Sequence, residues 1–194
     1  MIFIDYLSLL LINMAAGLVI LALYLFKGTT ETDQRKWSAV FAIPGVIAML
    51  NGLHIIWNWP LPGAYNSAFG EMSIMLGALF LGASLALAKG WDLLPLTIYS
   101  FFAGLAAIVL GVRFIDLKLT MTPLLCGTGF ILTGLAGVFA GLVLYLRANR
   151  SIRIISALIL LITAAIWGMI GYGAYWMHME GFSKWLPTTL KMLK

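Results

Sequence analysis

Apolar residues form six long runs along the chain, and the short segments between them carry most of the charged residues. Each run approaches the roughly 20 residues that an α-helix needs to cross the hydrocarbon core of a bilayer. The runs are too long for transmembrane β-strands and lack their alternation. The pattern therefore predicts an all-α polytopic membrane protein, a six-transmembrane-helix bundle. Its helices are expected at about 6–26, 37–58, 68–88, 93–112, 122–146 and 154–177.

The composition supports this prediction, because 62% of the 194 residues are hydrophobic and only 10% are charged. A soluble domain cannot bury so much apolar surface, so the lipid bilayer is the expected partner. The joining segments are short, and residues 1–178 are expected to form one bundle. Residues 179–194 are too short to span; we expect either an amphipathic segment at the membrane interface or a frayed tail. The sequence does not predict a soluble surface rich in basic and aromatic residues, so nothing in it suggests nucleic-acid binding.

With six spans, both termini lie on the same side of the membrane. The first, third and fifth connections contain seven of the 12 lysines and arginines. The positive-inside rule then places these connections in the cytoplasm and both termini outside.

Glycines recur at helical spacing in the fourth and fifth predicted helices. Gly137 and Gly141 form a GxxxG pair, and a spacing of seven residues relates Gly134 to Gly141 and Gly104 to Gly111. Such stripes let helix backbones approach closely in lipid. Two interpretations stay open for these five glycines: packing within one chain, or contact between protomers of a homo-oligomer.

Polar residues inside the apolar runs gather between Asn51 and Glu71. Asn51, His54 and Asn58 follow the spacing i, i+3, i+7 and therefore share one stripe of a helix. Polar groups that face lipid are costly, so this stripe is predicted to face the bundle interior. We predict a polar vestibule or pore mouth at the outer face. Its candidate residues are Asn13, Asn51, His54, Trp57, Asn58, Tyr65, Asn66, Glu71 and Tyr172.

Several of these residues have more than one interpretation. His54 is a hydrogen-bond partner between helices, a pH-sensitive gate, or, last, a haem ligand together with His178. Glu71 is a first-turn residue favoured by the helix dipole, or an acid that pairs with His54 at the pore mouth. The aromatic candidates line a constriction or belong to an interfacial belt.

Signatures of soluble enzymes are absent from the sequence, which contains no GxGxxG, Walker A, HExxH, CxxC or G-x-S-x-G motif. Two histidines and one cysteine cannot build a rich metal site. We therefore expect no metal, no cofactor and no enzymatic activity.

Two resemblances can be stated. With "IDYLSLLLINMAAGLVILALYLFKG" and "PLPGAYNSAFGE", nearly the whole chain resembles a family of uncharacterised prokaryotic membrane proteins with a domain of unknown function, which implies a prokaryotic cell membrane. The turn "GWDLLPLTIYSFFAG" is similar to one in the urea and short-chain amide channel family. The matching positions are Gly90, Asp92, Pro95, Tyr99, Ser100 and Phe102. The second resemblance implies a homo-oligomer, a hexameric ring, with one narrow pore in each protomer.

The leading hypothesis is a passive channel or facilitator for a small polar solute, such as an amide, a weak acid or ammonia, with a pore in each protomer. The alternative is a structural or haem-binding electron-transfer subunit of a larger membrane complex. A membrane enzyme that acts on lipid comes third, for want of a nucleophile and base.

Overall fold

The computed structural model describes residues 5–183 and is built of helices joined by short connections. The six long helices are α1 (Tyr6–Phe26), α2 (Ser38–Asn58), α3 (Met72–Lys89), α4 (Leu96–Asp116), α5 (Pro123–Tyr145) and α6 (Arg150–Phe182). The short helical turns are η1 (Gly28–Thr30), η2 (Arg35–Trp37) and the π-helical η3 (Asn66–Glu71), which leads into α3. Six helices are long and apolar enough to cross a membrane. The protein is an integral membrane protein, and the predicted all-α six-helix bundle is confirmed.

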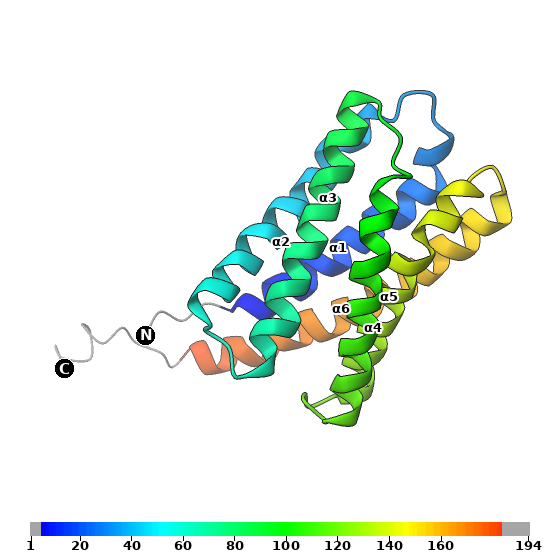
Figure 1. Ribbon diagram of the computed structural model, residues 1–194. Coiled ribbons are helices and arrows are strands. Elements are labelled where there is room, and N and C mark those ends of the chain that lie inside the picture. Colours follow the sequence, from blue (N-terminus) through cyan, green and yellow to red (C-terminus); the bar gives the residue numbers. More distant parts are fainter. Residues whose placement is uncertain (1–4, 184–194) are drawn as a thin grey trace, which may run out of the picture.

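The helices are arranged as three antiparallel pairs: α1 with α6, α2 with α3, and α4 with α5 (Figure 1). Two pairs are hairpins of consecutive helices, whereas the third joins the first helix to the last. We call the end of the bundle where α1 begins and α6 ends the terminus end. The opposite end, with the connections at 27–37, 90–95 and 146–149, is called the basic end.

Glycines set the close approach within these pairs. A Cβ atom added to Gly104 would lie 2.5 Å from the carbonyl oxygen of Gly134, and one added to Gly111 would lie 2.6 Å from that of Gly127. The backbones of α4 and α5 therefore touch along a glycine stripe. The five glycines singled out in the sequence all contact the opposite helix of this pair: Gly104, Gly111, Gly134, Gly137 and Gly141. The structure thus uses them for packing within one chain.

The largest difference from the expected boundaries concerns α6, which extends beyond 154–177 in both directions. At its start, the side chain of Asn149 accepts hydrogen bonds from the N–H groups of Ser151, at 2.9 Å, and Ile152, at 3.4 Å, so the cap lies before the apolar run. At its end, the helix continues through Phe182. The first residues of the expected tail 179–194 therefore belong to α6, and 184–194 lie outside the described residues.

Candidate functional site

A cavity of about 460 Å³ lies inside the bundle, displaced toward the basic end. All six long helices contribute to its wall, and within residues 5–183 no lining side chain is charged. Its polar side chains are Tyr24, Thr97, Ser100, Thr133 and Ser156. The Thr97 hydroxyl donates to the carbonyl oxygen of Leu94, just before α4, and the hydroxyls of Ser100 and Thr133 donate to backbone carbonyls of their own or the neighbouring helix. The cavity therefore presents an almost purely hydrocarbon surface.

Stacked aromatic rings close the cavity toward the terminus end. We call Tyr65, Phe69, Phe114, Phe130 and Trp167 the terminal aromatic cluster. The ring centroids of Phe130 lie 5.1 Å from those of Phe114 and Trp167, and 5.5 Å from that of Phe69. All of these rings except that of Tyr65 are buried. Rings from η3, α4, α5 and α6 thus fill the centre of the bundle at this end.

A second aromatic group closes the cavity toward the basic end. Tyr24 lies edge-on to Trp37 and Phe41, and Phe41 contacts Phe80 at a centroid distance of 5.4 Å. The Tyr24 hydroxyl donates to Oε1 of Gln34 at 2.6 Å, and Nε1 of Trp37 donates to Glu31 at 2.7 Å. These bonds fasten the first connection across this end of the bundle.

The same connection contains a charged contact, because Nζ of Lys36 lies 3.1 Å from Oε2 of Glu31. The hydrogen bond from Trp37, and then that from Lys36, hold the pKa of Glu31 below its usual range. The carboxylate is therefore kept ionised at the edge of the basic end.

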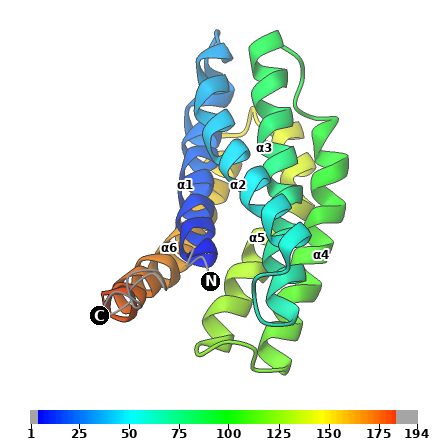
Figure 2. The ribbon, with the colours of Figure 1, turned by 90° about the vertical axis from the view of Figure 1, so that its left-hand side faces the viewer.

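We infer a lateral opening of the cavity between α5 and α6 from the exposure of three lining side chains. Leu135, Phe139 and Ile159 line the cavity, yet they are 37%, 52% and 42% exposed. Toward the terminus end, the opening stops where Nε1 of Trp167 donates to Oγ1 of Thr133 at 2.9 Å. Toward the basic end, the connection at 146–149 joins the two helices. Figure 2 shows that α6 leans away from α5 at the terminus end, on the other side of the Trp167–Thr133 contact from the cavity.

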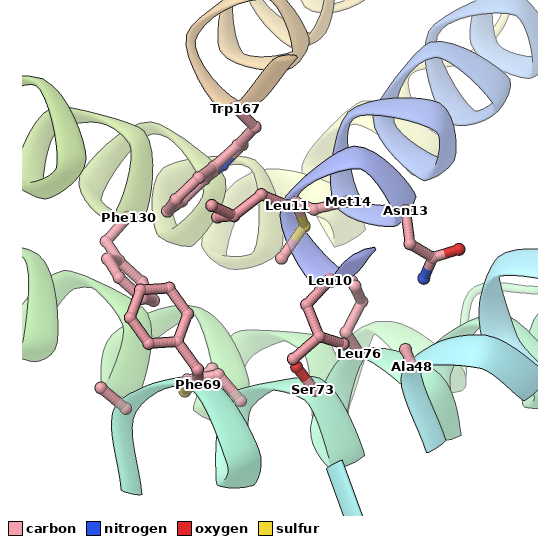
Figure 3. A pocket seen from close by; sticks show the side chains of 12 residues that line it. Leu10, Leu11, Asn13, Met14, Ala48, Phe69, Ser73, Leu76, Phe130 and Trp167 are labelled. Atoms are coloured by element: carbon pink, nitrogen blue, oxygen red, sulfur yellow. The ribbon is translucent and has the colours of Figure 1, made fainter. Parts of the chain in front are cut away.

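A second, much smaller space of about 20 Å³ lies on the terminus-end side of the cavity, and Figure 3 shows the side chains that line it. The two spaces share Met14, Met72, Leu76 and Phe130. A void of this size holds about one water molecule. Polar side chains reach it from two helices, since Asn13 of α1 and Ser73 of α3 both line it. Asn13 is therefore the one predicted vestibule residue that lines an internal space.

His54 lies at the interface between α2 and α1. Its Nε2 atom is 2.9 Å from the hydroxyl oxygen of Tyr6, and the two rings stack with centroids 5.1 Å apart. The Asn58 side chain donates to the carbonyl oxygen of His54 at 3.0 Å and lies 3.3 Å from its Nδ1 atom. This geometry matches the interpretation of His54 as a hydrogen-bond partner between helices.

His178 contacts the same turn of α1 from α6. Its Nδ1 donates to the Asp5 carboxylate at 2.7 Å and lies 3.4 Å from the Ser8 hydroxyl. Asp5 in turn accepts a hydrogen bond from the N–H of Ser8 and caps α1. Both histidines are thus engaged with adjacent residues, Asp5 and Tyr6, and hold the start of α1. Between residues 5 and 183, no group of three or more His, Cys, Asp and Glu side chains could hold a metal ion.

The structure gives local roles to three more predicted vestibule residues. Asn51 donates to the carbonyl oxygen of Ile47 in its own helix at 3.0 Å. Asn66 is fully buried, and its Oδ1 accepts from the N–H of Leu61 at 2.8 Å, so it locks the loop before η3. The Tyr65 hydroxyl donates to the carbonyl oxygen of Leu119. These polar groups are satisfied by the backbone and line neither space, which corrects the interpretation of a shared vestibule.

The remaining predicted vestibule residues lie on the outside of the bundle. Trp57 is 75% exposed and Tyr172 is 64% exposed. Glu71 is exposed as well, and within the described part of the chain it forms no ion pair with His54. Trp57 and Tyr172 therefore line neither internal space of the described chain, and exposed positions of this kind suit an interfacial belt.

The cavity was not predicted from the sequence. The available signal was the series of small residues that α4 and α5 turn toward it, which include Ala103, Ala107, Ala136 and Ala140. These residues read as ordinary packing positions, because nothing in the sequence shows that large side chains fail to face them.

Comparison with known proteins identifies a family but no activity. Residues 1–181 match the family described as "Protein of unknown function (DUF981)". No curated protein and no solved structure matches the chain.

Proposed function

Because the chain belongs to this family of unknown function, we propose from the cavity alone that the protein binds an apolar or amphipathic, lipid-like molecule inside its helix bundle. The single observation behind this proposal is an uncharged, hydrocarbon-lined cavity of about 460 Å³ with a lateral opening between α5 and α6. Ligand cavities typically measure about 300–1,000 Å³ and are predominantly apolar.

The free-energy cost of an empty space supports an occupant. At roughly 24 cal/mol per Å³, an enclosed and empty void of this size would cost on the order of 10 kcal/mol, which is comparable with the whole stability of a typical domain. Water does not offset this cost, because the wall offers it few hydrogen-bond partners. The surrounding bilayer supplies apolar chains at high concentration, and the lateral opening faces it.

The test is saturable binding of a fluorescent fatty-acid analogue to the delipidated protein in detergent. Ala140→Phe places a ring in the cavity and should abolish binding. Leu142→Phe is the matched control, since Leu142 is exposed on the same helix and does not line the cavity. Equal binding by the two variants would overturn the proposal.

A second candidate function is the one expected from the sequence, a facilitator for a small polar solute with a pore in each protomer of a homo-oligomer. The observation that favours it is the 20 Å³ space beside Asn13 and Ser73, which extends the cavity toward the terminus end. The resemblance of the turn at Gly90–Gly104 to the urea and short-chain amide channels also supports it. The route would be closed by the terminal aromatic cluster, in the manner of a hydrophobic gate.

This candidate predicts a gain of permeability when the cluster is opened. Phe130→Ala should speed the uptake of urea, acetamide or ammonia into proteoliposomes, measured by stopped-flow light scattering. Phe101→Ala, a change at an exposed ring of α4, is the control. Rates equal to those of protein-free liposomes for the wild type and both variants would exclude the candidate.

We also propose, from the positive-inside rule, that the basic end faces the cytoplasm of a prokaryotic cell and that both termini lie outside. With Cys126 replaced by alanine, a cysteine at exposed Thr32 should react with a membrane-impermeant maleimide only after the cells are opened. Labelling of intact cells would reverse the orientation.

A further inference from the structure

Three arginines lie in and next to the connection that joins α5 to α6 at the basic end, close in sequence to residues that line the cavity. Arg147 comes three positions after the lining residue Leu144 of α5, and Arg153 comes three positions before the lining residue Ser156 of α6. Arg153 lies within α6, so at 1.5 Å per residue it is roughly 4.5 Å along the helix direction beyond Ser156. Arg147 lies in the turn that follows the end of α5 at Tyr145. Arg150, the first residue of α6, lies between them in the chain. The hydrocarbon wall is therefore followed directly by a cationic rim.

The guanidinium groups of this rim keep unused hydrogen-bonding capacity. Nη1 of Arg153 donates to the carbonyl oxygen of Arg147 at 2.9 Å, while its Nε is buried and has no hydrogen-bond partner within residues 5–183. Arg150 is exposed and forms no ion pair in the same range. Within residues 5–183, the acid that pairs with this rim is Asp92, whose Oδ1 lies 3.6 Å from Nη1 of Arg147. The rim thus retains a net positive charge.

The start of α6 does not explain this arrangement. The side chain of Asn149 already accepts from the N–H groups of Ser151 and Ile152, so the helix is capped without the arginines. A role in topology alone requires charge on the cytoplasmic side but no buried, unsatisfied N–H. The unpartnered Nε–H of Arg153, three residues beyond the lining residue Ser156, fits a site whose acceptor comes from a bound molecule.

We propose that the lateral opening takes an anionic amphiphile with a phosphate head group, held by Arg150 and Arg153 while its apolar chain enters the cavity; this assignment rests on the proposed lipid-like occupant. Guanidinium groups match phosphate oxygens in bidentate geometry, and charge-assisted hydrogen bonds of this kind are strong. A phospholipid or a lipid phosphate places its anionic group at the membrane surface and its chain in the hydrocarbon region. In the protein, the cationic rim corresponds to the position of the anionic head group, and the apolar cavity corresponds to the position of the chain.

The experiment compares two fluorescent probes with the same long alkyl chain, one a phosphate monoester and the other the free alcohol. Both are titrated into the delipidated full-length protein in non-ionic detergent. The wild type should bind the phosphate probe at least tenfold more tightly than the alcohol. Arg153→Gln should remove most of that preference and leave the affinity for the alcohol unchanged. Arg150→Gln, a change at an exposed residue, repeats the test should Arg153→Gln not fold.

Controls separate this inference from the proposed function. Arg113→Gln removes the same charge at the terminus end and should change neither affinity. Ala140→Phe should abolish binding of both probes, and persistent binding would refute the proposed function itself. Equal affinities of the wild type for the two probes, or equal effects of the arginine variants at the two ends, would overturn the phosphate assignment alone. Displacement of the probe by millimolar inorganic phosphate would identify a free-ion site and overturn the amphiphile.

Discussion

The two halves of the bundle contain the same six helices and the same kind of apolar residue, yet one half is filled and the other is hollow. At the terminus end, Phe69, Phe114, Phe130 and Trp167 pack ring against ring. Toward the basic end, α4 and α5 present alanines and glycines to the centre instead. The difference shows that hydrophobicity selects the membrane, whereas side-chain volume decides where an internal space remains.

The largest effect should follow from emptying the filled half. Trp167→Ala removes a fully buried ring and its hydrogen bond to Thr133, and it should lower the free energy of unfolding by about 3–5 kcal/mol. The measurement is reversible unfolding in mixed micelles with increasing SDS. Trp176→Ala is the control, because Trp176 on the same helix is 85% exposed. Equal losses for the two variants would contradict a close-packed terminus end.

Adding volume to each half sharpens the comparison. Ala164 is buried in the core of the filled half, so Ala164→Leu should cost about 1–3 kcal/mol through overpacking. Ala140 faces the cavity, and Ala140→Leu in the delipidated protein should cost nothing or raise the free energy of unfolding. The same SDS titration measures both. A similar cost at the two sites would mean that the cavity does not persist in the folded protein.

A smaller effect is expected where α1 is fastened at the terminus end. Tyr6→Phe removes the hydroxyl that bonds to His54 but keeps the stacked ring, so the loss should be about 1 kcal/mol. Tyr175→Phe, which removes an exposed hydroxyl from α6, provides the reference. Hydrogen exchange of the first turn of α1 should accelerate only in the former variant. Unchanged exchange there would show that the bond does not hold the helix end.

The smallest effect concerns the basic end and depends on pH. The pKa of Glu31 is lowered in the folded protein, so its stabilising contribution is present above the ordinary value of 4.5 and is lost as the pH falls through the folded-state value. The melting temperature of the wild type should therefore fall faster than that of Glu31→Gln below about pH 4.5. Glu180→Gln, at the terminus end, should follow the wild type. Parallel curves for the wild type and Glu31→Gln would show that these bonds do not contribute.

The helices could be predicted because an apolar run long enough to span the bilayer directly indicates a helix surrounded by lipid. The ends of α6 could not be predicted in this way, because the helix is longer than the apolar run. Asn149 caps the helix before the run begins, and Met179–Phe182 continue it after the run ends. The glycine stripe predicted a close contact between helices but not which helix is in contact. The same glycine spacing occurs in contacts within one chain and in contacts between chains. The distances to the backbone of the facing helix make that choice.

The candidate site was harder to predict because the sequence does not show which residue a polar side chain will bond to in the folded protein. Asn66 sits among the polar residues of a supposed vestibule, but a loop that bends back brings Leu61 and Gly63 within reach of its amide. His54 shares a stripe with Asn51 and Asn58, yet its main partner, Tyr6, lies far away in the sequence. The cavity depends on which small residues face one another, and a single sequence does not contain that information.

The pairing of α1 with α6 has a consequence for how the protein is made. During synthesis, α1 enters the membrane five helices before its principal partner, so the α2–α3 and α4–α5 hairpins can form while α1 waits. Docking of α6 on α1 is then the step that completes the wall beside the lateral opening. The helix that docks last, α6, also forms one side of the opening through which a lipid chain would enter, and a lipid present at that moment would be enclosed as the bundle closes.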